Sequence, residues 1–122
     1  MLAHERLQAW KLCHELVLAV YEATKGFPKH ELYGLTSQAR RAAFSAAVNI
    51  VEGAAKRGPA EFRRFLDISV GSLAELAYAL RVARDLKLLD ESSWTALERV
   101  RRQAGLMTWR LYSAVGKAVR RS

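Results

Sequence analysis

Hydrophobic residues recur every three or four positions in four successive segments of the chain. This spacing places apolar side chains on one face of an α-helix, whereas the side chains of a β-strand alternate between two faces. The four segments cover residues 5–25, 35–57, 59–87 and 91–119. We therefore predict an all-α fold. The connections between the segments are short, which favours antiparallel up-down packing as a four-helix bundle, with residues 1–122 forming one domain.

Three of the segments have an apolar face that we expect to form the core. In the first segment it consists of Leu7, Trp10, His14, Val17, Tyr21 and Thr24. In the third it consists of Phe62, Phe65, Leu66, Ser69, Leu73, Leu76 and Leu80. In the fourth, a seam with steps of three and four residues consists of Leu97, Val100, Ala104, Met107, Leu111, Ala114 and Ala118. The spacing also predicts two i,i+4 ion pairs on the solvent side of the third helix, Arg63 with Asp67 and Arg81 with Asp85.

Residues that commonly cap helices stand at the start of two segments. Thr36 or Ser37 is expected to cap the second helix, and Asp90, Ser92 or Ser93 the fourth. A side-chain oxygen at such a position accepts a hydrogen bond from a free backbone N–H of the first turn.

The second segment is apolar over too wide an arc for a helix that is packed on one side only, which predicts oligomerisation. A polar stripe interrupts the apolar surface and contains Gln38, Arg41, Ser45, Asn49 and Glu52. This stripe has two interpretations. It is either a solvent-exposed face, or a mostly buried network that lines a subunit contact or a central pore and in which Arg41 and Glu52 offset one another.

Positive charge is in excess and is unevenly distributed. Twenty Lys and Arg against twelve Asp and Glu give a net charge of +8, which favours partners such as nucleic acid or an anionic membrane surface. Residues 35–58 carry a net +3 and residues 89–122 a net +4, while the other segments are close to neutral. In the fourth helix most cations lie on one side, away from the seam; they are Arg99, Arg102, Arg110, Lys117, Arg120 and Arg121.

The basic side of the fourth helix also has two interpretations. It is either an ordinary solvated face or a nucleic-acid-binding track, because Lys and Arg that displace condensed counterions supply affinity without sequence preference. Trp109 and Tyr112 neighbour this side. These aromatic rings either stack on bases or belong to the core or a subunit contact.

Motifs for catalysis or for metal and cofactor binding are absent from the sequence. No glutamate is followed three residues later by histidine, as di-iron bundles require, and the three histidines lack metal-ligand spacing. The single cysteine, Cys13, cannot form an internal disulfide, and no apolar run is long enough to span a bilayer. We expect a cytoplasmic protein that is not an enzyme and needs no cofactor or metal. His14 is expected in the core or at an interface.

One stretch carries a family signature. Residues 34–53 read GLTSQARRAAFSAAVNIVEG. The stretch resembles the signature of the 23S rRNA intervening-sequence protein family, which also includes accessory proteins of diversity-generating retroelements. Further matching pieces extend the resemblance over about residues 5–90; they include Leu7, Trp10, residues 16–21, residues 31–33, Phe62, residues 64–66 and residues 71–73. The resemblance implies a four-helix bundle that forms a homopentamer, has a basic surface and has no known catalysis.

Two functions remain open. The first is a basic oligomeric scaffold that binds RNA or DNA with little sequence preference; the retroelement branch of the family implies a reverse transcriptase as a further partner. The alternative is a structural or protein-interaction oligomer that docks an acidic protein and has no physiological nucleic acid binding. A membrane-surface helix fits less well, because the seam of the fourth helix is what the core of a bundle needs.

Overall fold

The computed structural model describes residues 1–121, and these residues form helices and connecting turns without a β-strand. The main helices are α1 (Gln8–Thr24), α2 (Leu35–Ala54), α3 (Pro59–Asp85) and α4 (Glu91–Arg121). Two short 3-10 helices, η1 (Ala3–Arg6) and η2 (Lys29–Glu31), precede α1 and α2. The predicted all-α class is confirmed, and each main helix begins and ends within a few residues of its predicted bounds.

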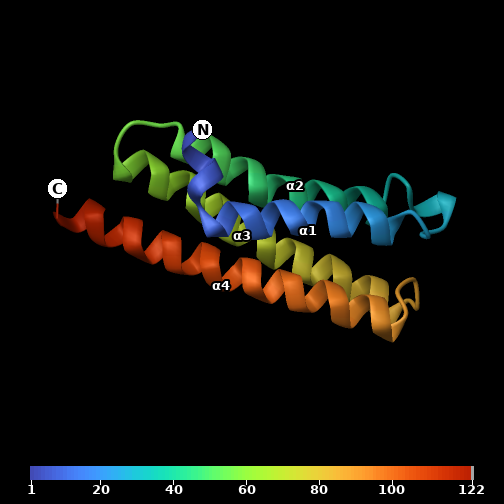
Figure 1. Ribbon diagram of the computed structural model, residues 1–122. Coiled ribbons are helices and arrows are strands. Elements are labelled where there is room, and N and C mark those ends of the chain that lie inside the picture. The colour runs from blue at the N-terminus through green and yellow to red at the C-terminus, as the bar shows by residue number, and fades with distance from the viewer. Residues whose placement is uncertain (122) are drawn as a thin grey trace.

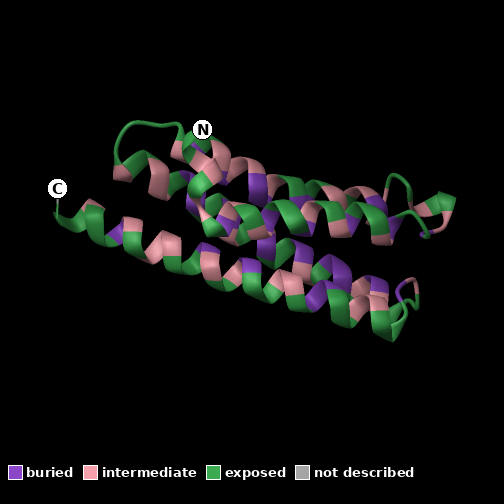
Figure 2. Ribbon diagram, viewed as in Figure 1, coloured by how far each residue is buried: buried purple, intermediate pink, exposed green. Residues whose placement is uncertain are grey.

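The four main helices pack side by side and alternate in direction along the chain (Figure 1). α1 contacts α2 and α4, and α3 contacts the same two helices, so the helices surround one core. Buried residues follow the inward side of every helix (Figure 2). This arrangement confirms the predicted four-helix bundle. None of the described helices is both long and apolar enough to cross a membrane.

The start of α2 differs from the prediction. Its N-cap is Gly34, and neither Thr36 nor Ser37 caps the helix. The backbone N–H of Leu35 instead donates to Oε1 of Glu31 at 3.0 Å. A carboxylate from the preceding turn therefore satisfies a free N–H of the first turn, and Thr36 is free to be buried in the bundle.

The other two helix starts follow ordinary capping chemistry. Pro59 occupies the first turn of α3, where its missing N–H costs nothing, and it follows Gly58 in a left-handed conformation with φ of 83°. Asp90 caps α4, since its Oδ1 accepts a hydrogen bond of 2.7 Å from the backbone N–H of Ser93. Of the three predicted capping residues for this helix, Asp90 is the one that forms the cap.

The core face of α1 is rotated from the predicted one. Cys13, Leu16 and Val20 are fully buried, whereas His14 and Tyr21 are exposed, so these two do not lie in the core of the single chain. The rest of the predicted face does contribute: Thr24 is buried, and Leu7, Trp10 and Val17 pack partly buried against the core. Burying the side of Leu16 and Val20 desolvates no imidazole or phenol, and its polar atoms are bonded, the Cys13 thiol to Thr108 and the Thr24 hydroxyl to the Val20 carbonyl.

The seam of α4 is also correct only in its first half. Leu97 and Ala104 are buried, but Ala114 and Ala118 are exposed. A strict seam of 3.5 residues drifts around a straight helix of 3.6 residues per turn, so the inward side of a long helix moves to other positions. Thr108 is fully buried, and its Oγ1 lies 3.6 Å from the Cys13 Sγ of α1 in a hydrogen bond.

α2 and α3 approach closely because the inward side of α2 consists largely of small residues. These are Ala39, Ala42, Ala43, Ala46, Ala47 and Gly53, all buried. The Ser69 Oγ of α3 donates to the Ala46 carbonyl at 2.9 Å. At Gly53 there is no space for a side chain, since a Cβ there would lie 2.8 Å from the Phe65 Cβ. The two helices are therefore packed nearly backbone to backbone.

Candidate nucleic-acid interface

The six cations predicted to lie on one side of α4 are all exposed. They are Arg99, Arg102, Arg110, Lys117, Arg120 and Arg121. At 1.5 Å of rise per residue they extend over roughly 33 Å of the helix. We call this side of α4 the basic face.

Only one member of the basic face has its charge partly neutralised. The Arg102 Nε lies 3.4 Å from Oε2 of Glu98, while the other five cations make no ion pair with any of residues 1–121. Their positive charge is therefore available to an anion from outside the chain.

Glu98 is held mainly by Arg101, which points away from the basic face. The Arg101 guanidinium donates to both carboxylate oxygens of Glu98, at 2.9 and 2.7 Å. These hydrogen bonds are the main reason that the pKa of Glu98 is lowered from its ordinary value. Sequence reasoning missed that Glu98 is buried. The only signal was the pair of arginines three and four residues after it.

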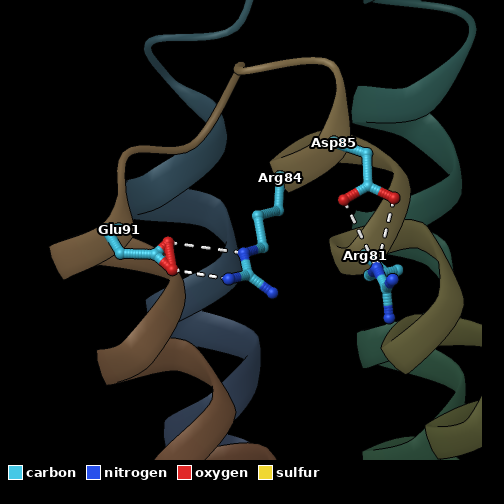
Figure 3. Close-up of polar contacts among 4 residues, drawn as sticks. All are labelled: Arg81, Arg84, Asp85 and Glu91. Carbon is cyan, nitrogen blue, oxygen red and sulfur yellow. Dashed lines mark hydrogen bonds and ion pairs between the residues drawn. The ribbon is translucent and has the colours of Figure 1, made fainter.

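Two arginines at the turn between α3 and α4 are compensated by carboxylates (Figure 3). Arg84 Nη2 lies 2.6 Å from Oε1 of Glu91, and its guanidinium also covers the Trp94 ring at 4.1 Å. Arg81 pairs with Asp85 at 3.1 Å, as the spacing predicted. The charges of Arg81 and Arg84 are therefore compensated at this turn, whereas the exposed Lys87 of the same turn has no ion pair with any of residues 1–121.

The second predicted ion pair of α3, Arg63 with Asp67, does not form. Arg63 instead reaches across to α4, where its guanidinium lies 5.3 Å from the centre of the Tyr112 ring. Spacing along one helix predicts only contacts within that helix. Here the aromatic face of Tyr112 on the neighbouring helix attracts the Arg63 guanidinium instead. Arg63 thereby adds a cation beside the C-terminal half of the basic face, which the sequence did not indicate.

Trp109 lies beside the basic face and is half exposed. The residue has an exposed fraction of 53%, and its ring lies 5.4 Å from that of Tyr112, centre to centre. Tyr112 is more deeply placed and packs against the core. Of the two aromatic residues considered for base stacking, Trp109 is thus the one with an accessible face.

The polar stripe of α2 is divided in the structure. Gln38, Arg41 and Glu52 are exposed, and Arg41 and Glu52 form no ion pair with each other or elsewhere in the described part of the chain. Ser45 and Asn49 are half buried and bonded to each other, with the Asn49 Nδ2 donating to the Ser45 Oγ at 3.1 Å.

The half-buried part of the stripe connects α2 to α3. The Ser45 Oγ shares a hydrogen bond of 2.7 Å with the Ser72 Oγ of α3. A polar groove next to this contact is lined by Gln38, Arg41, Ser45, Ser72 and Glu75. Within a single chain the stripe is therefore a helix-helix contact bordered by exposed charges.

Large apolar side chains are exposed on α1 and on α2. Leu18 of α1 is 59% exposed and Phe44 of α2 is 56% exposed. The Arg40 guanidinium of α2 covers the ring of Tyr21 of α1 at 4.7 Å, and Phe44 follows Arg40 by one helical turn. If these side chains form a contiguous patch, they are suited to a protein-protein contact.

The only thiol does not have the properties of a nucleophile. Burial raises the pKa of Cys13 to about 11, so the thiol is protonated at neutral pH. Residues 1–121 also contain no group of three or more His, Cys, Asp or Glu side chains arranged to hold a metal ion.

Comparison with known proteins identifies the family. No curated protein is significantly similar to the chain. A family model described as 23S rRNA-intervening sequence protein matches residues 5–108. The match covers more of the chain than the resemblance seen in the sequence, and it extends through α4 as far as the buried Thr108. The chain belongs to the 23S rRNA-intervening sequence protein family.

Proposed function

We propose that the protein is a non-enzymatic basic scaffold of the cytoplasm that forms a homo-oligomer and binds RNA or DNA with little sequence preference. The observation that carries this proposal is the set of five exposed cations on the basic face of α4 that make no ion pair with any of residues 1–121. Such cations bind phosphates by releasing condensed counterions, which supplies affinity but does not distinguish one base sequence from another.

Oligomerisation is supported by the large exposed apolar side chains of α1 and α2, Leu18 and Phe44. Five copies are what membership of the family suggests. Each copy adds a net charge of +8, so a ring multiplies weak phosphate contacts into one large positive surface. Light scattering that finds only monomers at micromolar concentration contradicts this part of the proposal.

The binding part is tested by the salt dependence of binding. Fluorescence anisotropy with a labelled RNA at several salt concentrations gives the slope of log K against log salt. The variant Arg99→Gln/Arg110→Gln removes two unpaired cations and is expected to reduce the slope by about one for each phosphate that the variant no longer neutralises. The control, Lys25→Gln/Arg81→Gln, removes the same charge from two cations that are already ion-paired, and is expected to change the slope little.

The results separate the two candidate functions. Equal slopes for the two double variants contradict a phosphate-binding role for the basic face. If the wild type binds neither RNA nor DNA at low salt, the docking of an acidic protein partner becomes the better explanation of the same cations. A reverse transcriptase gene with a template repeat beside the gene of this protein supports the role of accessory to that enzyme.

A further inference from the structure

Two guanidinium groups from different helices meet at Gly116 of α4. A Cβ at Gly116 would lie 3.5 Å from the Arg63 Nε of α3 and 3.7 Å from the Arg120 Nη1 of α4. Both groups therefore approach the same point on the α4 backbone. Gly116 is buried, and both guanidinium groups lie at ordinary van der Waals distance from the position that a Cβ would take there.

Neither arginine has a carboxylate partner within residues 1–121. Arg63 Nε is also buried and has no hydrogen-bond acceptor. The nearest acid in the first turn of α3, Glu61, is occupied by Arg64 at 2.8 Å. Two cations without ion-pair partners lie beside each other, and one of them is partly desolvated. An anion bound between them would reduce their mutual repulsion. Guanidinium groups match the geometry of phosphate oxygens particularly well.

An aromatic surface lies on the same line of α4. Trp109, Gly116 and Arg120 are separated by seven and four residues, so they follow one side of the helix, with Trp109 about 10 Å from Gly116. Trp109 is half exposed, and Tyr112 lies between it and Arg63, 5.4 Å from one and 5.3 Å from the other. The exposed ring of Trp109 thus lies near the two guanidinium groups.

We propose that Arg63, Arg120 and Trp109 form a binding site for single-stranded nucleic acid, in which the two arginines bind a backbone phosphate and Trp109 stacks on an unpaired base. The inference rests on the function proposed above and makes it more specific. In a duplex the faces of the bases are covered by their neighbours, so Trp109 stacks on a base only where the strand is unpaired. The site therefore favours single strands over duplexes.

A pair of matched glycine variants tests the phosphate contact. Gly116→Asp places a carboxylate between the two guanidinium groups, where the nearest contacts leave room for a Cβ. Gly71→Asp makes the same change on the exposed side of α3, where a Cβ meets nothing within 4 Å. We expect Gly116→Asp to weaken binding of a labelled single-stranded oligonucleotide about tenfold, because the new carboxylate takes the charged hydrogen bonds that the phosphate would accept. Gly71→Asp is expected to weaken it less than about twofold, since only the net charge changes.

A second pair tests stacking. Trp109→Ala is expected to weaken single-strand binding about tenfold and to leave binding of the matching duplex unchanged, whereas Trp109→Phe keeps a ring and most of the affinity. Far-UV circular dichroism verifies that each variant is folded. If Gly116→Asp does not fold, Arg63→Gln replaces it.

The outcomes distinguish this inference from the general function. If Gly116→Asp and Gly71→Asp bind a single strand equally well, or if Trp109→Ala weakens single strand and duplex alike, the site proposed here is wrong. The general function survives that result as long as Arg99→Gln/Arg110→Gln still reduces the salt slope. If the wild type binds no nucleic acid at all, both proposals fall together.

Discussion

Replacing Gly53 with alanine sets two opposing effects against each other. Alanine is favoured over glycine inside a helix by about 1 kcal/mol, which on its own stabilises the protein. At Gly53, however, the added Cβ lies 2.8 Å from the Phe65 Cβ and 2.9 Å from the Phe62 Cδ1. The Phe65 Cβ is attached directly to the backbone, so α2 and α3 must move apart to admit the new atom.

The packing effect is expected to be the larger one. Inserting an atom into a tightly packed contact costs about 1–3 kcal/mol, and the rigid neighbours of Gly53 place this substitution at the upper end. After the gain in helix propensity is subtracted, the free energy of unfolding is expected to fall by about 2 kcal/mol. With a slope near 2 kcal/mol per molar urea, the midpoint of urea unfolding then falls by about 1 M.

Gly71→Ala is the matched control, since it lies inside α3 with nothing within 4 Å of the new Cβ. Only the propensity effect acts there, so its midpoint is expected to rise by up to about 0.5 M. Both variants are followed by circular dichroism at one protein concentration, because the stability of an oligomer depends on concentration. If Gly53→Ala is as stable as Gly71→Ala, the close approach of α2 and α3 at this glycine is refuted.

Three further predictions concern polar groups of the bundle. Asp90→Ala removes the carboxylate that accepts the hydrogen bond from the Ser93 N–H, and thermal unfolding is expected to show a loss of about 1 kcal/mol in stability. Asp90→Asn is expected to retain most of the stability of the wild type. Equal melting temperatures for the two variants contradict the capping role. Because hydrogen bonds from Arg101 lower the pKa of Glu98, the folded state binds this proton less readily than the unfolded state, so the pair stabilises the fold above the ordinary carboxyl pKa of 4.5. That stability is lost as the pH falls through the lowered pKa. Glu98→Gln is expected to be less stable than the wild type at pH 7 by about 1–3 kcal/mol, and the difference in stability is expected to narrow in acid. A difference that stays constant from pH 7 to 3 contradicts this prediction. The Cys13 thiol, with a pKa of about 11, is expected to resist iodoacetamide at pH 8 until the protein is unfolded, as measured by mass spectrometry; rapid labelling of the folded protein refutes its burial.

The fold was largely predictable because it depends on periodicity. The apolar positions of α3 are spaced as a helix requires, and its predicted core face is buried apart from the half-buried Phe62. The errors arise where sequence spacing has two solutions. α1 is apolar on two sides, and only packing decides that Leu16 rather than Tyr21 faces inward. The cap at the start of α2 comes from Glu31, a residue of the preceding turn that sequence rules for capping do not consider.

The candidate site was predictable only where a single helix carries it. The cations of α4 recur on one side of the helix, so the basic face could be placed from the sequence although the predicted seam is wrong in its second half. Contacts between helices could not be predicted from the sequence, because no local pattern specifies which side chain a neighbouring helix presents. Arg63 pairs with Tyr112 of α4 instead of Asp67, and Glu98 is buried beneath its own arginines. The meeting of Arg63 with Arg120 depends on α3 and α4 running antiparallel.

The unequal compensation of charge at the two ends of the bundle makes each copy an electric dipole along its long axis. At the turn between α3 and α4, Arg81 and Arg84 are paired with carboxylates. The C-terminal end of α4 lies at the opposite end of the molecule (Figure 1), and Arg120 and Arg121 there make no ion pair with any of residues 1–121. In a ring whose rotation axis runs along the bundles, all copies point the same way and their dipoles add, so that one rim of the ring is more positive than the other. A two-fold dimer with antiparallel copies would place positive charge at both ends. The symmetry of the oligomer thus decides whether a nucleic acid meets one face of the assembly or two.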